Sequence, residues 1–212
     1  MTESETNRFD SILFDMDGTL WDAVESYCAV WNVTIDMLCP GVDHVHYARL
    51  CAMMGKPIED IFASFIGGAA PFDLFMKTLL DNEAVIMPRL GGKLYPGVRD
   101  TIERLAATHR LFMVSNCTPE GIPNFLAFTG LAPFITDHIS YGQNGREKDY
   151  NIALMVGRHG LAAPLYVGDT AGDCRSTHAA GVPFAWASYG FGRDVADYDF
   201  RLDSFSDLLN IV

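Results

Sequence analysis

Four short apolar runs, each ending directly in a polar or glycine-containing turn, constrain the fold of this chain more than any other feature. They cover residues 12–14, 111–114, 165–167 and 184–187, and a weaker run covers 139–141. A short run that is continuously apolar is typical of a strand buried on both faces of a parallel sheet. The sequence therefore predicts four buried strands and a fifth candidate.

Helical patterns occupy the stretches between these runs. They cover 98–108, 150–159 and 173–180, and the last two stop at Gly160 and Gly181, where glycine favours the end of a helix. Ser204 and Asp207 resemble a capping box at the start of a last short helix. Strands that alternate with helices predict an α/β fold, in which helices cover both faces of a parallel sheet.

A long insertion separates the first strand from the next core helix. It comprises the 74 residues from Trp21 to Leu94, too many for a structureless loop in a compact domain. Its apolar spacing predicts helices over 23–38, 45–54, 58–66 and 72–84. We therefore expect a core domain, residues 1–20 and 95–212, and a small α-helical cap domain, residues 21–94, inserted after the first strand.

The chain is acidic, with 15 Lys and Arg against 27 Asp and Glu and a net charge of −12. Nucleic acid and anionic membranes are not expected as partners, because both call for a basic patch on the protein. No apolar run is long enough to span a membrane, and the polar residues 1–8 predict no signal peptide. Five scattered cysteines without a CxxC pair favour a reduced, cytoplasmic setting.

Two carboxylates, Asp15 and Asp17, follow the first predicted strand in the segment DMDGTL at 15–20. Just beyond a strand end, one carboxylate can attack as a nucleophile while the other moves protons. Gly18 lets the chain bend close to a ligand. An acidic turn without a chemical role is the alternative interpretation of this segment taken alone.

A second acidic pair, Asp169 and Asp173, follows the run at 165–167. Alone, the pair fits a helix start, with Asp169 as the cap and Asp173 in the first turn. Ligands of open α/β sheets bind at the carboxyl ends of the strands, so we expect this pair to lie near Asp15 and Asp17. So much negative charge at one edge favours a Mg²⁺ site, because Mg²⁺ takes carboxylates together with water and substrate phosphate.

Three further residues can bind phosphate. Ser115 and Asn116 follow the run at 111–114 with a hydroxyl and an amide. Lys148, near the start of the helix at 150–159, can place a positive charge on a transferring phosphoryl group. Each also fits an ordinary turn or a solvated surface. Their positions relative to the acidic motifs favour a common site.

The chain resembles the haloacid dehalogenase (HAD) superfamily, in particular its phosphoglycolate phosphatase-like subgroup with a helical cap after the first strand. The resemblance covers about residues 9–209. The segments that carry it are DMDGTL at 15–20, YPGV at 95–98, VSN at 114–116, Lys148, VGDTAGDCRSTHAAG at 167–181 and YGFG at 189–192. It implies a Rossmann-like core and Mg²⁺-dependent phosphoryl transfer through an aspartyl-phosphate.

The resemblance also implies a role for each matching acidic residue. Asp15 is the nucleophile and a metal ligand. Asp17 is the general acid and base, and its backbone carbonyl also binds the metal. Asp169 binds Mg²⁺, and Asp173 supports the metal site.

The phosphate-binding residues that the resemblance implies are Thr19, Ser115, Asn116 and Lys148. The family lysine is often followed by proline, but Asp149 follows Lys148, so Arg146 is an alternative for that role. Trp21 is bulkier than the residue expected after the first loop.

In the cap, Arg49 and Lys56 lie where relatives place residues that meet the substrate. Either could bind a substrate carboxylate or hydroxyl, and His44 and His46 are further candidates. All four side chains also fit exposed helix surfaces.

A phosphatase for a small phosphorylated metabolite, phosphoglycolate-like or sugar-phosphate-like, is the best interpretation. A β-phosphoglucomutase-like phosphotransferase shares both aspartates and the cap, and a non-catalytic binding or regulatory protein could use the same scaffold. Asp17 disfavours a dehalogenase, which does not need that acid and base, and no clear cap lysine beyond Lys56 supports a phosphonatase. The sequence leaves open the substrate and the choice between monomer and dimer.

Overall fold

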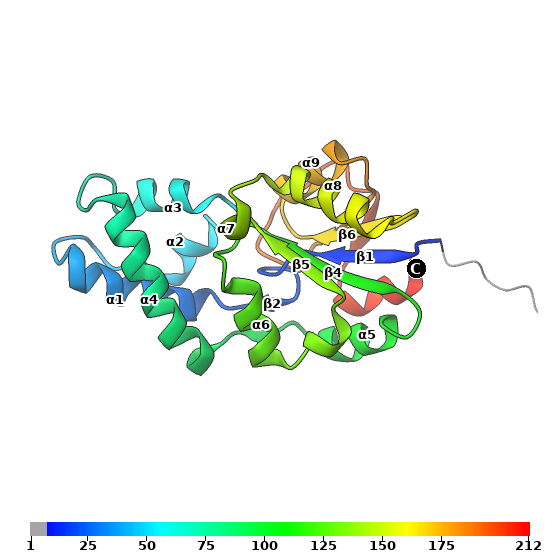
Figure 1. The fold of residues 1–212 in the computed structure, drawn as a ribbon, viewed down its shortest axis with the longest axis horizontal. Coiled ribbons are helices and arrows are strands. Elements are labelled where there is room, and N and C mark those ends of the chain that lie inside the picture. The colour runs from blue at the N-terminus through cyan, green and yellow to red at the C-terminus, as the bar shows by residue number, and fades with distance from the viewer. Residues whose placement is uncertain (1–7) are drawn as a thin grey trace, which may run out of the picture.

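A six-stranded parallel sheet forms the centre of the larger part of the molecule (Figure 1). The computed structural model describes residues 8–212, so the remaining polar start, for which the sequence predicts no signal peptide, lies outside the described residues. In spatial order the strands are β5 (Asp137–Ser140), β4 (Arg110–Ser115), β1 (Ser11–Phe14), β6 (Pro164–Gly168), β7 (Phe184–Ala187) and β8 (Phe200–Leu202). The predicted α/β class is confirmed, and β1 lies between β4 and β6.

Helices cover both faces of this sheet (Figure 1). One face packs against α5 (Val98–Leu105) and the 3₁₀ helix η2 (Phe205–Asn210), the other against α8 (Lys148–His159) and α9 (Ala171–Ala179). Ile12 and Phe14 belong to one buried cluster, and Leu13 to the second. Successive strand residues point to opposite faces. The run at 12–14 is therefore continuously apolar because both faces of β1 are covered.

A helical insertion follows β1. Its ends pair as two short antiparallel strands, β2 (Trp21–Asp22) and β3 (Lys93–Leu94), so the chain leaves and re-enters the core at one place. Between them lie α1 (Val24–Leu38), α2 (Tyr47–Cys51), α3 (Ile58–Phe65) and α4 (Phe72–Leu90), gathered to one side of the sheet in Figure 1. The Trp31 ring lies 5.5 Å from Phe65 and 5.4 Å from Phe75, and these rings continue the buried cluster that contains Ile12 and Phe14.

Some predicted boundaries are wrong. The helix predicted over 72–84 continues to Leu90. Val85 and Leu90 are exposed apolar residues that interrupt the apolar spacing, so the sequence pattern ends before the helix does. Pro88 is tolerated in the last turn, where its missing N–H leaves a single carbonyl unpaired. The helix predicted over 45–54 shortens to α2, and the predicted strand at 139–141 begins earlier, as β5.

Besides the short strands β2 and β3, four elements have no counterpart in the sequence prediction. They are α6 (Gly121–Thr129), the 3₁₀ helix η1 (Ala132–Phe134), α7 (Tyr141–Asn144) and β8. The 3₁₀ helix, α7 and β8 are too short to show a period. In α6 apolar residues outnumber polar ones on most sides, so no amphipathic pattern stands out.

Among residues 8–212, no helix combines the length and the hydrophobicity that a membrane crossing requires. All five cysteines are free thiols.

Candidate active site

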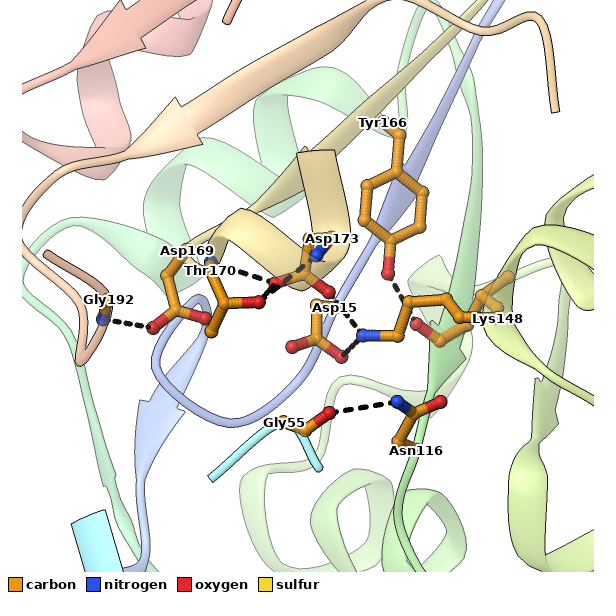
Figure 2. Close-up of polar contacts among 10 residues, drawn as sticks. Asp15, Gly55, Asn116, Lys148, Tyr166, Asp169, Thr170, Asp173 and Gly192 are labelled. Atoms are coloured by element: carbon orange, nitrogen blue, oxygen red, sulfur yellow. Dashed lines mark hydrogen bonds and ion pairs between the residues drawn. The ribbon is translucent and has the colours of Figure 1, made fainter. Parts of the chain in front are cut away.

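Acidic side chains from two neighbouring strands meet at one edge of the sheet. Asp15 directly follows β1, and Asp169 directly follows β6. The two strands are parallel and in register, with Phe14 opposite Val167, so their carboxyl ends lie side by side. Asp173 joins them from the first turn of α9, as Figure 2 shows. The convergence expected of these three carboxylates is what the fold produces.

The three carboxylates form a compact buried group. One oxygen from each of Asp15, Asp169 and Asp173 lies within 4.8 Å of the others, and each residue is at most 3% exposed. Oδ1 of Asp169 is buried without a hydrogen-bond donor among the described residues, and Oδ1 of Asp15 has the Lys148 ammonium 3.0 Å away. Buried carboxylate oxygens without donors call for a cation. An all-oxygen set suits a hard divalent ion such as Mg²⁺, so these residues fit the metal that the sequence predicts.

Lys148, the first residue of α8, reaches into this group (Figure 2). Its Nζ lies 3.0 Å from Oδ1 of Asp15 and donates to Oδ1 of Asp173. Burial lowers the pKa of Lys148, but the charges of Asp15 and Asp173 outweigh burial and hold that pKa well above its usual value. Arg146 instead lies over the Tyr150 ring, 5.1 Å from its centroid. The structure therefore brings Lys148, and not the alternative Arg146, to Asp15.

The negative charge of the three carboxylates exceeds the single positive charge of Lys148. Burial raises the pKa of Asp15, and the Lys148 ammonium offsets only part of that effect. Burial and the charges of Asp173 and Asp15 raise the pKa of Asp169 well above its usual value. Lys148 alone does not balance this charge, which favours a divalent cation among the carboxylates.

Asp17 faces the cavity with a different environment. Its Oδ1 accepts a hydrogen bond of 2.9 Å from Trp21 Nε1, which explains the bulky residue at position 21. The Trp21 ring also packs edge-on against Phe125, at 4.9 Å between centroids. Burial, followed by the charge of Asp15, raises the pKa of Asp17 to about 8. Near neutral pH this carboxyl can therefore carry a proton, as a general acid must.

Close backbone packing holds Asp169 in place. Gly18 has φ of +80°, and a side chain there would place Cβ 2.3 Å from Oδ2 of Asp169. That same oxygen accepts backbone hydrogen bonds from Phe191, at 2.7 Å, and from Gly192, at 3.1 Å. Figure 2 shows the Gly192 contact. The YGFG segment at 189–192 thus orients Asp169, a role that the sequence analysis did not assign.

The predicted phosphate-binding residues divide into two sets. Ser115 and Asn116 line the same cavity as Asp15 and Asp17, at the end of β4. Nδ2 of Asn116 donates to the Gly55 carbonyl of the cap at 2.9 Å, as Figure 2 shows. Thr19 does not line the cavity, is fully buried, and its hydroxyl has no hydrogen-bond partner among the described residues.

The cap candidates also separate. Lys56 lines the cavity, next to the Gly55 carbonyl that contacts Asn116. Arg49 does not line it: its guanidinium stacks over Phe65, 4.8 Å from the ring centroid. His44 contacts Asp36 at 2.9 Å, and neither His44 nor His46 lines the cavity.

A cavity of about 80 Å³ lies between the sheet edge and the insertion. Besides the predicted residues, Tyr27 of α1, Glu83 of α4 and Thr118 of the loop after β4 line it. The sequence analysis missed these three. Tyr27 and Glu83 follow helical patterns that look exposed or structural, and only the packing of the cap shows that they face the acidic group.

Comparison with known proteins supports the family resemblance that the sequence motifs indicate. The family model "Haloacid dehalogenase-like hydrolase" matches residues 12–187. A phosphoglycolate phosphatase of Aliivibrio fischeri is 28% identical over 213 residues, which cover 92% of this chain and 91% of that protein.

Two solved structures share the fold. A predicted phosphoglycolate phosphatase from Haemophilus somnus has a TM-score of 0.81 at 22% identity, covering 97% of this chain and 99% of that one. CbbY from Rhodobacter sphaeroides, solved as a mutant in complex with xylulose-(1,5)bisphosphate, has a TM-score of 0.79 at 20% identity and covers 94% of this chain and 96% of its own. With the family model matched from β1 to the end of β7, this chain belongs to the haloacid dehalogenase-like hydrolases, in the subgroup that resembles the phosphoglycolate phosphatases.

Proposed function

We propose that this protein is a magnesium-dependent phosphatase that hydrolyses a small phosphorylated metabolite. The observation that carries the proposal is the buried group of Asp15, Asp169 and Asp173, bridged by Lys148 at the edge of a cavity covered by the helical insertion. Relatives named phosphoglycolate phosphatase support a phosphomonoester as the substrate.

In this mechanism Asp15 attacks the phosphorus atom. The bond from phosphorus to the leaving oxygen breaks, and an aspartyl-phosphate forms on Asp15. Lys148 holds the attacking carboxylate in position. Protonated Asp17 gives its proton to the leaving oxygen and then takes a proton from the water that attacks phosphorus. This second step releases phosphate and restores Asp15.

The metal site would be built from the carboxylates of Asp15, Asp169 and Asp173, with the backbone carbonyl of Asp17. Bound Mg²⁺ would supply positive charge that neutralises the transferring phosphoryl group. Ser115 and Asn116 would bind phosphate oxygens at the cavity.

The function is tested by measuring phosphate release from a generic aryl phosphate with and without Mg²⁺. We expect release only with the metal and in equal amount to the alcohol formed. Transfer of the phosphoryl group to an added sugar phosphate, in place of free phosphate, would identify a phosphotransferase. No turnover of any phosphomonoester by the metal-loaded protein would contradict the proposal.

Asp169→Ala tests the metal site. Residues that only orient metal ligands typically contribute about 10- to 100-fold to metal affinity, so loss of a direct ligand should raise the Mg²⁺ concentration for half-maximal activity at least that much. Calorimetric titration with Mg²⁺ measures the same loss without turnover. Asp197→Ala, a change of another Asp outside the site, serves as the control. Unchanged Mg²⁺ affinity in the Asp169 variant would remove this residue from the metal site.

We further propose that residues 21–94 form a cap domain that controls access, while the core residues 1–20 and 95–212 carry the chemistry. Lys56 lines the cavity and follows Gly55, whose carbonyl accepts the hydrogen bond from Asn116. Lys56→Ala should raise KM for phosphomonoesters about tenfold with little change in kcat, because it removes attraction for an anionic substrate. Arg49→Ala, outside the cavity, should stay within about twofold of the wild type. Equal effects of the two changes would contradict this assignment.

A further inference from the structure

The two sides of the active-site cavity differ in chemistry. The core side presents Asp15, Asp17 and Ser115, the residues proposed to react with or bind the phosphoryl group. The cap side is mostly apolar and includes Val30, Trp31, Leu50, Ile61 and Leu79, with Lys56 as its positively charged side chain. Such a surface fits the carbon skeleton of a leaving group.

Glu83 is the buried charged exception on the cap side. It projects from α4 and is only 4% exposed. Thr118 donates its hydroxyl to Oε1 of Glu83 at 2.7 Å, and across residues 8–212 no Lys, Arg or His forms an ion pair with this carboxylate. Burial raises the pKa of Glu83, and the Thr118 bond offsets only part of that effect. A buried carboxylate without a cation is costly to a fold, so a positive group brought by a ligand would relieve it.

Glu83 and Tyr27 line the same cavity as Asp17. The charges of Asp17 and Glu83 add to burial in raising the pKa of Tyr27. Asp17 is the residue proposed to protonate the leaving oxygen. Tyr27 and Trp31 line the same cavity, and aromatic rings attract ammonium groups through their electron-rich faces.

We propose that the leaving group of the physiological substrate carries an ammonium group on a short apolar skeleton, and that Glu83 binds this ammonium. The inference rests on the proposed phosphatase function and specifies its substrate class: phosphomonoesters of amino alcohols. Lys56 lines the same cavity but forms no ion pair with Glu83, and its Nζ lies 3.6 Å from Sδ of Met53. Phosphoglycolate, whose leaving group carries a carboxylate, would meet Glu83 with like charge.

Three substrates of nearly equal size test this selectivity in the wild-type protein. Phosphoglycolate, 2-hydroxyethyl phosphate and phosphoethanolamine differ only in an anionic, neutral or cationic end. We expect kcat/KM to rise in that order, with at least about tenfold between the neutral and the cationic ester. Phosphocholine, added as a fourth substrate, distinguishes a primary from a quaternary ammonium. A wild type that prefers the carboxylate or hydroxyl ester to both ammonium esters would overturn the inference.

Glu83→Gln tests the residue itself. Glutamine keeps the size of the side chain and can still accept the Thr118 hydrogen bond, so only the charge is lost. The ratio of kcat/KM for phosphoethanolamine over 2-hydroxyethyl phosphate should fall about 10- to 100-fold. The control is Glu120→Gln, which removes the exposed carboxylate of the residue that precedes helix α6. It should leave the ratio within about twofold. An unchanged ratio in the Glu83 variant would refute the assignment of Glu83.

Binding separates this inference from the phosphatase function. In an Asp15→Asn background, which cannot form the aspartyl-phosphate, calorimetry should give tighter binding of phosphoethanolamine than of 2-hydroxyethyl phosphate. Adding Glu83→Gln should remove the difference. Hydrolysis of aryl phosphate with no preference among the three esters would leave the phosphatase standing and discard the ammonium site. Ammonium-selective binding without turnover by the wild type would do the reverse.

Discussion

Asp15→Asn is expected to reduce phosphate release to the limit of detection. An amide is a poor nucleophile towards phosphorus, and this change keeps the size and shape of the side chain. Lys148 keeps its bond to Asp173, so the surrounding group stays assembled. The midpoint of thermal unfolding should shift by no more than about 4 °C, which corresponds to about 1 kcal/mol for a chain of this size. Lost activity would then reflect lost chemistry and not unfolding.

The covalent intermediate gives this prediction its sharpest measurement. Wild-type protein quenched in acid within one turnover should carry a phosphoryl group on the peptide that contains Asp15, found by mass spectrometry. Asp43→Asn, in the exposed loop between α1 and α2, is the matched control and should keep full activity. Phosphate found on another residue, or substantial turnover by Asp15→Asn, would refute the nucleophile assignment.

The parallel sheet was predictable because burial on both faces leaves a continuous apolar run. Leu13 and Phe14 face opposite helical layers, so neither position tolerates a polar side chain. The two strands at the ends of the insertion were not predictable in the same way: β2 and β3 have two residues each and exist only because they pair. Similarly, β8 is three residues at the sheet edge and shows no pattern of its own.

The core half of the site was also predictable. Asp15, Ser115 and Asp169 each follow a strand, and parallel strands bring their carboxyl ends to one edge. The cap half was not, since residues on helices reach the cavity according to how those helices pack. Arg49 and Lys56 are seven residues apart and both exposed, yet only Lys56 lines the cavity.

Glu83 also shows that the sequence does not reveal which cap residues reach the cavity. It follows Asp81 and Asn82 in α4, and the sequence analysis assigned no role to any of the three. Nevertheless Glu83 is 4% exposed, because its position on α4 turns it toward Thr118 of the core. A sequence pattern records the faces of one helix, whereas this site depends on two parts of the chain that meet across the cavity.

Asp17→Asn is expected to slow turnover by about 10²- to 10⁴-fold, the range usual for loss of a general acid and base. Asparagine can still accept the hydrogen bond from Trp21 Nε1, so the loop geometry should persist. Hydrolysis of the aspartyl-phosphate should suffer as well, because the attacking water loses its base. Phosphoryl-Asp15 should therefore persist longer in this variant than in the wild type, as measured by acid quench and mass spectrometry.

The pH dependence distinguishes a proton-transfer role for Asp17 from a purely structural one. A general acid must be protonated, so wild-type kcat/KM should fall as pH rises through the pKa of Asp17. Burial and the charge of Asp15 set that pKa at about 8, and bound Mg²⁺ would lower it, so the fall should lie at or below about pH 8. In Asp17→Asn this fall should disappear, since nothing at position 17 titrates.

The choice of leaving group gives a second test of the same role. An ester whose leaving group has a low pKa, such as p-nitrophenyl phosphate, needs less protonation, so its hydrolysis should slow less in the variant than that of an alkyl ester. Equal losses on both esters, with the alkaline fall retained, would mean that another group transfers the proton.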